Sequence, residues 1–115
     1  MDVWKNIRLE LGRTDEFPRG SVSRGYLIRL PLDDDGMVDR AAFALHPHRA
    51  RVRRYWSTEP DQSGQIIENE GQWALCCNGI GRILQLDCRR VRRGYQVSII
   101  EEDGTILPYN VACIL

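Results

Sequence analysis

Hydrophobic and polar residues alternate along most of this chain, and this two-residue period restricts its fold more than any other feature. Near the start, Ile7, Leu9 and Leu11 alternate with Arg8 and Glu10. Successive side chains of a β-strand point to opposite faces, so this pattern predicts a strand with one buried face. The same alternation recurs in three more groups: Val22, Tyr26, Ile28, Leu30 and Leu32; Tyr95, Val97 and Ile99; and Leu107, Tyr109, Val111, Cys113 and Leu115.

Glycine-containing pairs mark the connections between the predicted strands. Asp103-Gly104 separates the last two alternating stretches, and Asn78-Gly79 separates QWALCC from IGRILQLDC. Both pairs readily adopt the positive φ angles of tight hairpin turns. Glu70-Gly71, just before QWALCC, predicts one more turn. Consecutive strands are therefore expected to pair in the antiparallel direction.

One segment lacks the alternation and predicts a short helix near residues 39–46. Asp39 is suited to cap the first turn of RAAFALH, and Pro47 forces the residue before it out of the helical region. The acidic run at residues 33–36 lacks the ligand spacing of a calcium-binding loop and predicts a turn before the helix. The helix is expected to bury one of its apolar residues, namely Ala42, Phe43 or Leu45.

The length and the spacing of the strands predict one domain. At 115 residues the chain forms a core large enough to be stable without disulfides or metals. Short strands separated by turns, with one small helix, predict a mainly β fold: an antiparallel barrel-like or sandwich domain spanning residues 1–115. Pro108 marks the last strand as an edge strand, which leads to the hypothesis of a homodimer formed by edge pairing.

Charge and hydropathy restrict the environment of the protein. The chain has 16 basic and 16 acidic residues, so its net charge is zero and electrostatic recognition must come from local clusters of charge. No apolar run approaches the roughly 20 residues of a membrane span, and the start MDVWKNIRLE lacks the features of a secretory signal. These features predict a cytoplasmic protein that does not contact membranes.

Arginine is concentrated in two segments of the chain. The first is HRARVRRYW, residues 48–56, and the second is CRRVRRGY, residues 88–95. If the first segment is a strand, one face carries Arg49, Arg51, Arg53 and Tyr55. The opposite face carries Ala50, Val52, Arg54 and Trp56. The candidate ligand-binding residues are Arg49, Arg51, Arg53, Tyr55, Arg92 and Arg93.

This pattern favours a non-catalytic binding or interaction module for an anionic partner. Arginines two residues apart on a strand are separated by about 6.6 Å, which suits successive phosphates or carboxylates. Tyr55 beside them is suited to stack on a base. The partner is therefore predicted to be single-stranded nucleic acid or an acidic protein surface. The competing interpretation is a hydrated strand face whose arginines pair with the acidic stretches of the same chain.

The histidines and cysteines suggest an alternative: a small enzyme or metal-binding protein that uses His46, His48 and a cysteine such as Cys77 or Cys88. The sequence has no C-x-x-C pair, nucleophile elbow, phosphate-binding loop or paired-acid motif. Cys77, Cys88 and Cys113 share their phase with apolar residues, as expected for thiols packed in a core. No catalytic residue, metal or cofactor is therefore predicted.

A series of turn, aromatic and strand residues extends over most of the chain. It comprises Glu16-Phe17-Pro18, Gly20-Ser21, Gly25-Tyr26, Pro31-Leu32-Asp33, Asp35-Gly36, Asp39, Val52-Arg53-Arg54, Trp56, Gly94-Tyr95, Val97-Ser98-Ile99, Asp103-Gly104, Pro108-Tyr109 and Val111. In these residues the chain resembles a family of small bacterial β-rich proteins with no established function. The stretch from Cys76 to Arg93 resembles that family least. The resemblance implies a fold and assigns no functional residue.

Overall fold

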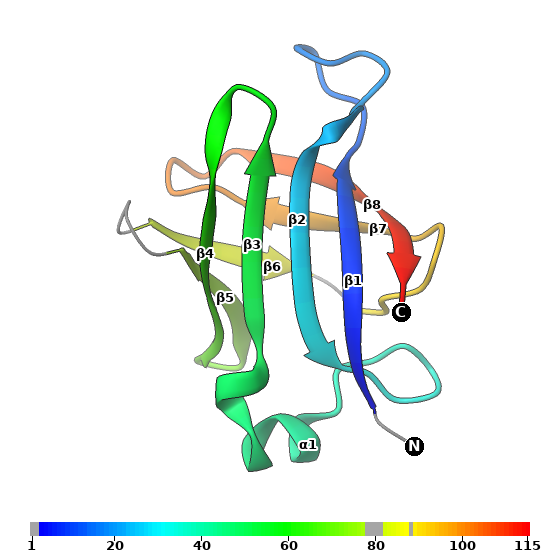
Figure 1. Ribbon diagram of the computed structural model, residues 1–115, viewed down its shortest axis with the longest axis vertical. Coiled ribbons are helices and arrows are strands. Elements are labelled where there is room, and N and C mark those ends of the chain that lie inside the picture. Colours follow the sequence, from blue (N-terminus) through cyan, green and yellow to red (C-terminus); the bar gives the residue numbers. More distant parts are fainter. Residues whose placement is uncertain (1–2, 78–81, 88) are drawn as a thin grey trace.

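The structure, a computed structural model, describes residues 3–77, 82–87 and 89–115, with the backbone alone at 82 and 83. In these residues eight antiparallel strands follow one another in chain order around a closed barrel (Figure 1). The strands are β1 (Trp4–Leu11), β2 (Ser21–Pro31), β3 (Arg51–Trp56), β4 (Glu59–Asn69), β5 (Gln72–Cys77), β6 (Arg82–Asp87), β7 (Gln96–Ile100) and β8 (Ile106–Ile114). The predicted mainly β, barrel-like domain is confirmed.

Two short helices connect β2 to β3 at one end of the barrel. They are α1 (Arg40–Leu45) and the 3₁₀ turn η1 (Pro47–Arg49). Asp39 caps α1 as predicted, because its carboxylate accepts the Ala42 N–H at 3.0 Å. Phe43 packs edge-on against Trp73 with ring centres 4.8 Å apart, whereas Leu45 is 75% exposed. None of the helices in the described residues is long and apolar enough to cross a membrane.

Removal of the α1 cap is expected to have a modest effect on stability. The variant Asp39→Ala should lose about 1 kcal/mol of the free energy of unfolding, because the Ala42 N–H loses its acceptor. Urea denaturation measures this loss. Asp34→Ala is the matched control, since Asp34 is exposed on the preceding turn, and its effect should stay within about 0.5 kcal/mol. Equal effects of the two substitutions would contradict a capping role.

The predicted turns are found where the structure describes them. Glu70 and Gly71 both have positive φ, 52° and 81°, and connect β4 to β5. At the β7–β8 turn Gly104 has a φ of 86°, and the Asp103 carboxylate accepts the Thr105 N–H at 2.9 Å. Asn78-Gly79 lies outside the described residues, although β5 and β6 pair antiparallel as predicted. Tight turns thus set the chain-order pairing of these strands.

The inward-facing side chains fill the barrel with a hydrophobic core. The buried residues include Ile7, Leu9 and Leu11 of β1, as the alternation predicts. Tyr26 and Tyr109 meet edge-on at the centre, with ring centres 5.3 Å apart. The buried residues of the alternating stretches thus form a single core, whereas Tyr95, which was predicted to face it, is 47% exposed.

Some side chains that were predicted to face the core lie outside it, because β-bulges shift the inward–outward alternation of the strands. Val22 is 69% exposed, since the β1–β2 register shifts between Glu10 and Leu11. A second shift between β1 and β8 leaves Ala112 unpaired, so Cys113 lies opposite Arg8 on the outer face. Leu115 beyond it is 80% exposed. Among the predicted core thiols, Cys77 is buried, Cys113 is not, and Cys88 lies outside the described residues.

The prediction that β8 is an edge strand is wrong. β8 pairs with β7 on one side and with β1 on the other, which closes the barrel. Pro108 lies just beyond the β1–β8 ladder, which ends at the Leu11–Tyr109 pair, so its missing N–H is not needed there. Its carbonyl oxygen accepts the Gly12 N–H at 2.9 Å. The open edge on which the homodimer hypothesis was based is therefore absent from the described sheet.

Candidate anion-binding site

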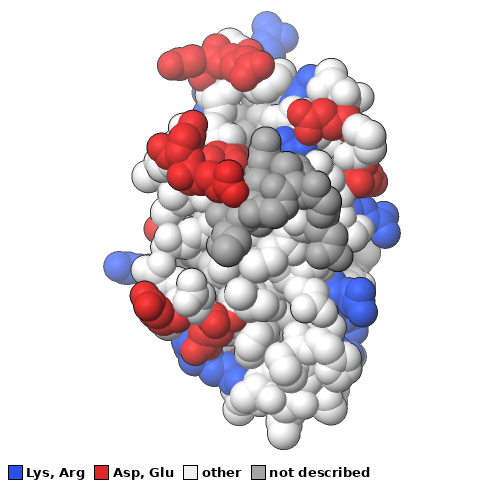
Figure 2. Space-filling view, turned by 90° about the vertical axis from the view of Figure 1, so that its left-hand side faces the viewer, with Lys and Arg blue, Asp and Glu red and all other residues white. Residues whose placement is uncertain are grey.

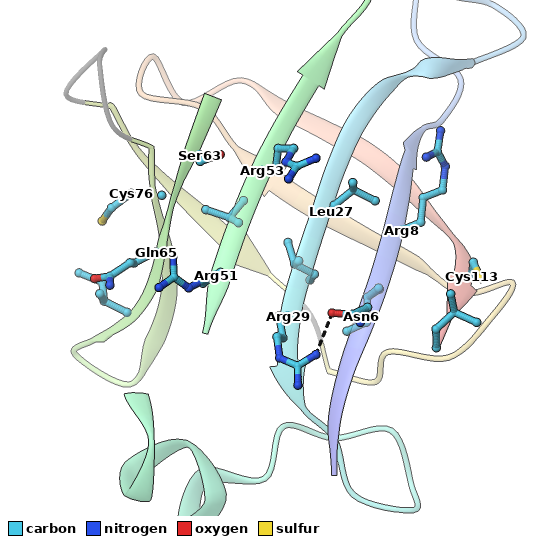
Figure 3. A pocket seen from close by; sticks show the side chains of 16 residues that line it. Asn6, Arg8, Leu27, Arg29, Arg51, Arg53, Ser63, Gln65, Cys76 and Cys113 are labelled. Atoms are coloured by element: carbon cyan, nitrogen blue, oxygen red, sulfur yellow. Dashed lines mark hydrogen bonds between the residues drawn. The ribbon is translucent and has the colours of Figure 1, made fainter. Parts of the chain in front are cut away.

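A hollow of about 920 Å³ lies on the outer face of β1–β4, with further lining residues from β5 and β8 (Figure 3). Four arginines from three strands line it, namely Arg8, Arg29, Arg51 and Arg53. The lining as described contains no aspartate or glutamate. We call this site the arginine hollow. Its four positive charges make it attractive to anions.

The strand register explains why these side chains meet. One row across the sheet consists of Asn6, Arg29, Arg51, Gln65 and Cys76. The next row consists of Cys113, Arg8, Leu27, Arg53 and Ser63. Neighbouring strands are about 4.8 Å apart, so each row places its side chains in contact range of one another.

Two arginines of the hollow lie directly opposite each other. Arg29 of β2 pairs with Arg51 of β3, and Arg53 follows two residues later on the same face. Like charges at such positions destabilise a sheet. An anion bound between these guanidinium groups would reduce such repulsion.

Arg51 and Arg53 are the arginines available to a ligand. Both side chains are exposed, and in the described part of the chain neither has a hydrogen-bond or ion-pair partner. Arg29, by comparison, donates to Asn6 Oδ1 at 2.9 Å. The predicted outward orientation of Arg51 and Arg53 is therefore observed, and it leaves two guanidinium groups without an internal carboxylate.

Arg8 occupies the β1 side of the hollow in a fixed position. Its Nε donates to Glu10 Oε2 at 3.0 Å, and its Nη2 donates to the Val22 carbonyl oxygen at 3.0 Å. The hydrogen bond to Glu10 is the main cause of the raised pKa of Arg8. Its guanidinium lies 4.7 Å from the centre of the Tyr55 ring. The charge of Arg8 is thus already paired with the Glu10 carboxylate, and part of its hydrogen-bonding capacity is used.

Tyr55 and Arg49, both predicted to contact a ligand, have other roles in the fold. Arg8 covers the Tyr55 ring, and the Tyr55 hydroxyl donates to the Leu9 carbonyl oxygen at 3.0 Å. Burial raises the pKa of this hydroxyl. Arg49 lies in η1 with its guanidinium 4.8 Å from the centre of the Trp4 ring. Neither residue lines the hollow.

The second predicted arginine cluster lies elsewhere on the molecule. Arg92 donates to the carbonyl oxygens of Asp35 and Asp34, at 3.1 Å and 3.2 Å, and so supports the acidic turn. Arg93 and Lys5 line a separate hollow of about 470 Å³. The two hollows have no lining residue in common. The two arginine clusters of the sequence therefore do not form one surface.

The structure adds Arg8 and Arg29 to the site, together with Asn6 and Gln65. In the sequence, the arginines occupy the polar positions of the alternating pattern: Arg8 alternates with buried residues of β1, and Arg29 lies between Ile28 and Leu30 of β2. The alternation assigns these residues to an outer face. It does not show that this face adjoins Arg51, because that depends on the strand register.

Several acidic side chains lie together on one side of the barrel. Figure 2 shows several groups of Asp and Glu side chains on the side that lies to the left in Figure 1. The chain as a whole has no net charge, yet the lining of the arginine hollow contains no acid. The lining of the hollow therefore carries basic side chains without an acidic one, although Glu10 beside it pairs with Arg8.

Arg54 lies on the inner face of β3, and its predicted inward orientation is confirmed. The residue is 8% exposed, and its Nη1 donates to Glu59 Oε2 at 2.7 Å. Its guanidinium lies 4.2 Å from the centre of the Trp56 ring. The neighbouring Tyr26 and Tyr109 hydroxyls have no hydrogen-bond partner in the described structure. Arg54 therefore does not line the arginine hollow.

The histidines lie at the α1 end of the barrel. His46 and His48 are exposed, with ring centres 6.0 Å apart. Over residues 3–77, 82–87 and 89–115, no three His, Cys, Asp or Glu side chains form a group that could hold a metal ion. The alternative function that uses His46, His48 and a cysteine remains a prediction.

Comparison with known proteins does not assign a function, so the functional interpretation is based on the arginine hollow. No family model, curated protein or solved structure matches this chain. The resemblance to small bacterial β-rich proteins therefore remains a prediction.

Proposed function

We propose that this domain is a non-catalytic binding module whose arginine hollow binds an anionic partner, either single-stranded nucleic acid or an acidic protein surface. The observation that supports this function is the convergence of four arginines from three strands on a lining without acidic residues. Guanidinium groups are planar and donate two parallel hydrogen bonds to a carboxylate or a phosphate. Arg51 and Arg53 are free for such contacts in the described structure.

Recognition in this proposal uses side chains and not the backbone. The closed barrel pairs both sides of every described strand, so a partner cannot add a strand to an open edge. Ser63 and Gln65 next to the arginines supply further hydrogen-bonding groups. A cytoplasmic location is part of the proposal, because a free thiol such as that of Cys113 is typical of a reducing compartment.

Charge reversal at Arg53 should weaken binding of an anionic partner at least about tenfold, or about 1.4 kcal/mol. The glutamate of Arg53→Glu removes one cation and repels the ligand, while its exposed position leaves the fold intact. NMR titration of isotope-labelled protein with single-stranded RNA and with an acidic peptide measures the affinity. The shifted signals should lie on the outer face of β1–β4, and the affinity should fall as salt rises.

Arg93→Glu provides the matched control for this experiment. It makes the same change in net charge at an exposed arginine outside the hollow, so affinity should change less than about threefold. Circular dichroism verifies that both variants are folded. Equal losses in the two variants would show a general charge effect instead of a site, and unchanged affinity in Arg53→Glu would remove the hollow as the binding surface.

A further inference from the structure

We infer that the partner of the arginine hollow is an extended acidic protein segment that also carries apolar side chains, and not a nucleic acid strand. This inference rests on the proposed function, because it names the ligand of the same site. It follows from two properties of the lining: its apolar side chains and its lack of available aromatic rings. The spacing of its arginines suits carboxylates as well as phosphates and so agrees with this ligand.

Apolar side chains lie among the charges of the hollow. Leu27 lies between Arg8 and Arg53 in the cross-strand row, as Figure 3 shows. Ile67 and Leu115 also line the site, and both are exposed. Covering such side chains with apolar groups is favourable, at about 25 cal/mol for each Å² removed from water. A protein segment offers leucine or isoleucine for this purpose, whereas a phosphodiester backbone offers mainly charge.

Aromatic rings suitable for base stacking are absent from the described lining. It contains no Phe, Tyr, Trp or His. Tyr55, the next outward-facing residue of β3 after Arg53, already has the Arg8 guanidinium over its ring. Proteins that bind single strands commonly combine a positive groove with rings on which successive bases stack. The hollow has the charge of such a groove without its stacking surface.

The spacing of the free arginines fits an extended peptide. Arg51 and Arg53 are two residues apart on β3, which corresponds to about 6.6 Å. An extended peptide repeats at the same distance, so acidic side chains two residues apart can each face one guanidinium. Bidentate carboxylate–guanidinium pairs then form while neighbouring apolar side chains reach Leu27.

The inference can be tested with three probes of equal charge. The first is a seven-residue peptide with three glutamates and two leucines, and the second has serines in place of the leucines. The third is a four-nucleotide oligouridylate with three phosphodiesters. Fluorescence anisotropy at constant ionic strength measures their affinities. The leucine peptide should bind at least about tenfold more tightly than the serine peptide or the RNA, because two leucines bury apolar area.

Variants of the protein separate the contributions of charge and apolar contact. Arg53→Glu should weaken both peptides, whereas Leu27→Ser should weaken the leucine peptide alone and leave the serine peptide unchanged. Ile67→Ser should have the same effect as Leu27→Ser. Because Ile67 is exposed, this variant should remain folded even if Leu27→Ser does not. Thermal unfolding identifies any variant that is not folded.

The possible failures are distinguishable. If the RNA binds as tightly as the leucine peptide, or the two peptides bind equally, the inference is overturned. Dependence on Arg53 would in that case still support the proposed function. If none of the three probes shows a dependence on Arg53, both the inference and the proposed function are wrong.

Discussion

Replacement of Gly64 by alanine is expected to destabilise the barrel by more than about 4 kcal/mol. Gly64 lies within β4, opposite Val52 of β3 and Cys77 of β5. A Cβ atom at this position would overlap the Cys76 carbonyl oxygen and would lie 2.7 Å from Cys77 Cα. Both obstacles are backbone atoms, so relief requires β4 and β5 to separate, which breaks ladder hydrogen bonds. Urea denaturation followed by tryptophan fluorescence measures the loss.

Gly71→Ala distinguishes this steric effect from the general cost of losing a glycine. Gly71 has a φ of 81°, but no atom lies within 4 Å of a Cβ added there. Alanine at this position should therefore cost about 1 kcal/mol, from backbone strain alone. Similar losses at the two positions would mean that β4 and β5 do not approach each other closely at Gly64. Because Gly64 also lines the arginine hollow, a folded Gly64→Ala protein should show altered ligand affinity as well.

Raising the pH above 10 is expected to reduce stability steeply, because two tyrosines are buried in the core. Burial raises the pKa of Tyr26 to about 12, and it raises the pKa of Tyr109 further. In the unfolded chain a tyrosine loses its proton near pH 10. Between about pH 10 and 12 the unfolded state therefore binds fewer protons than the native state, and the free energy of unfolding decreases as pH rises. Two protons correspond to about 2.7 kcal/mol per pH unit.

Urea denaturation at pH 8, 10 and 11 would measure this slope, with the phenylalanine variants as controls. Tyr26→Phe with Tyr109→Phe removes both ionisable groups and should abolish most of the alkaline loss. The double variant should stay close to wild type at pH 8, since neither hydroxyl has a hydrogen-bond partner in the described structure. An unchanged alkaline slope in the double variant would rule out these tyrosines as the cause.

Much of the local structure could be predicted because its causes are local. The alternation of Ile7, Leu9 and Leu11 places them in the core of β1, as observed. Asp39 caps its helix, and Glu70-Gly71 adopts positive φ, because both effects depend on a few adjacent residues. Predictions from alternation failed at bulges, where an extra residue changes the phase. Cys113 is the clearest case, since Ala112 has no partner in the β1–β8 ladder.

Part of the candidate site could also be predicted. The alternation in β3 places Arg51 and Arg53 on the outer face, and their exposure agrees with this. It did not show that Tyr55 lies under Arg8, or that Arg92 supports the acidic turn. These contacts join residues 47 and 57 positions apart or more in sequence, so only the folded chain brings them together.

The sequence by itself determined the strands that alternate, the tight turns, the capped helix and the side of β3 that carries arginine, because each depends on the period of a strand or on the conformation of a few neighbouring residues. It did not predict the first half of β4 (Glu59–Asn69), which lacks such alternation. Only the tertiary structure decided that β8 closes onto β1, and that Arg8 and Arg29 adjoin Arg51 and Arg53 in one hollow. Strand register is set by turns, bulges and core packing acting together. The residues that adjoin one another across neighbouring strands are therefore fixed only when the barrel closes.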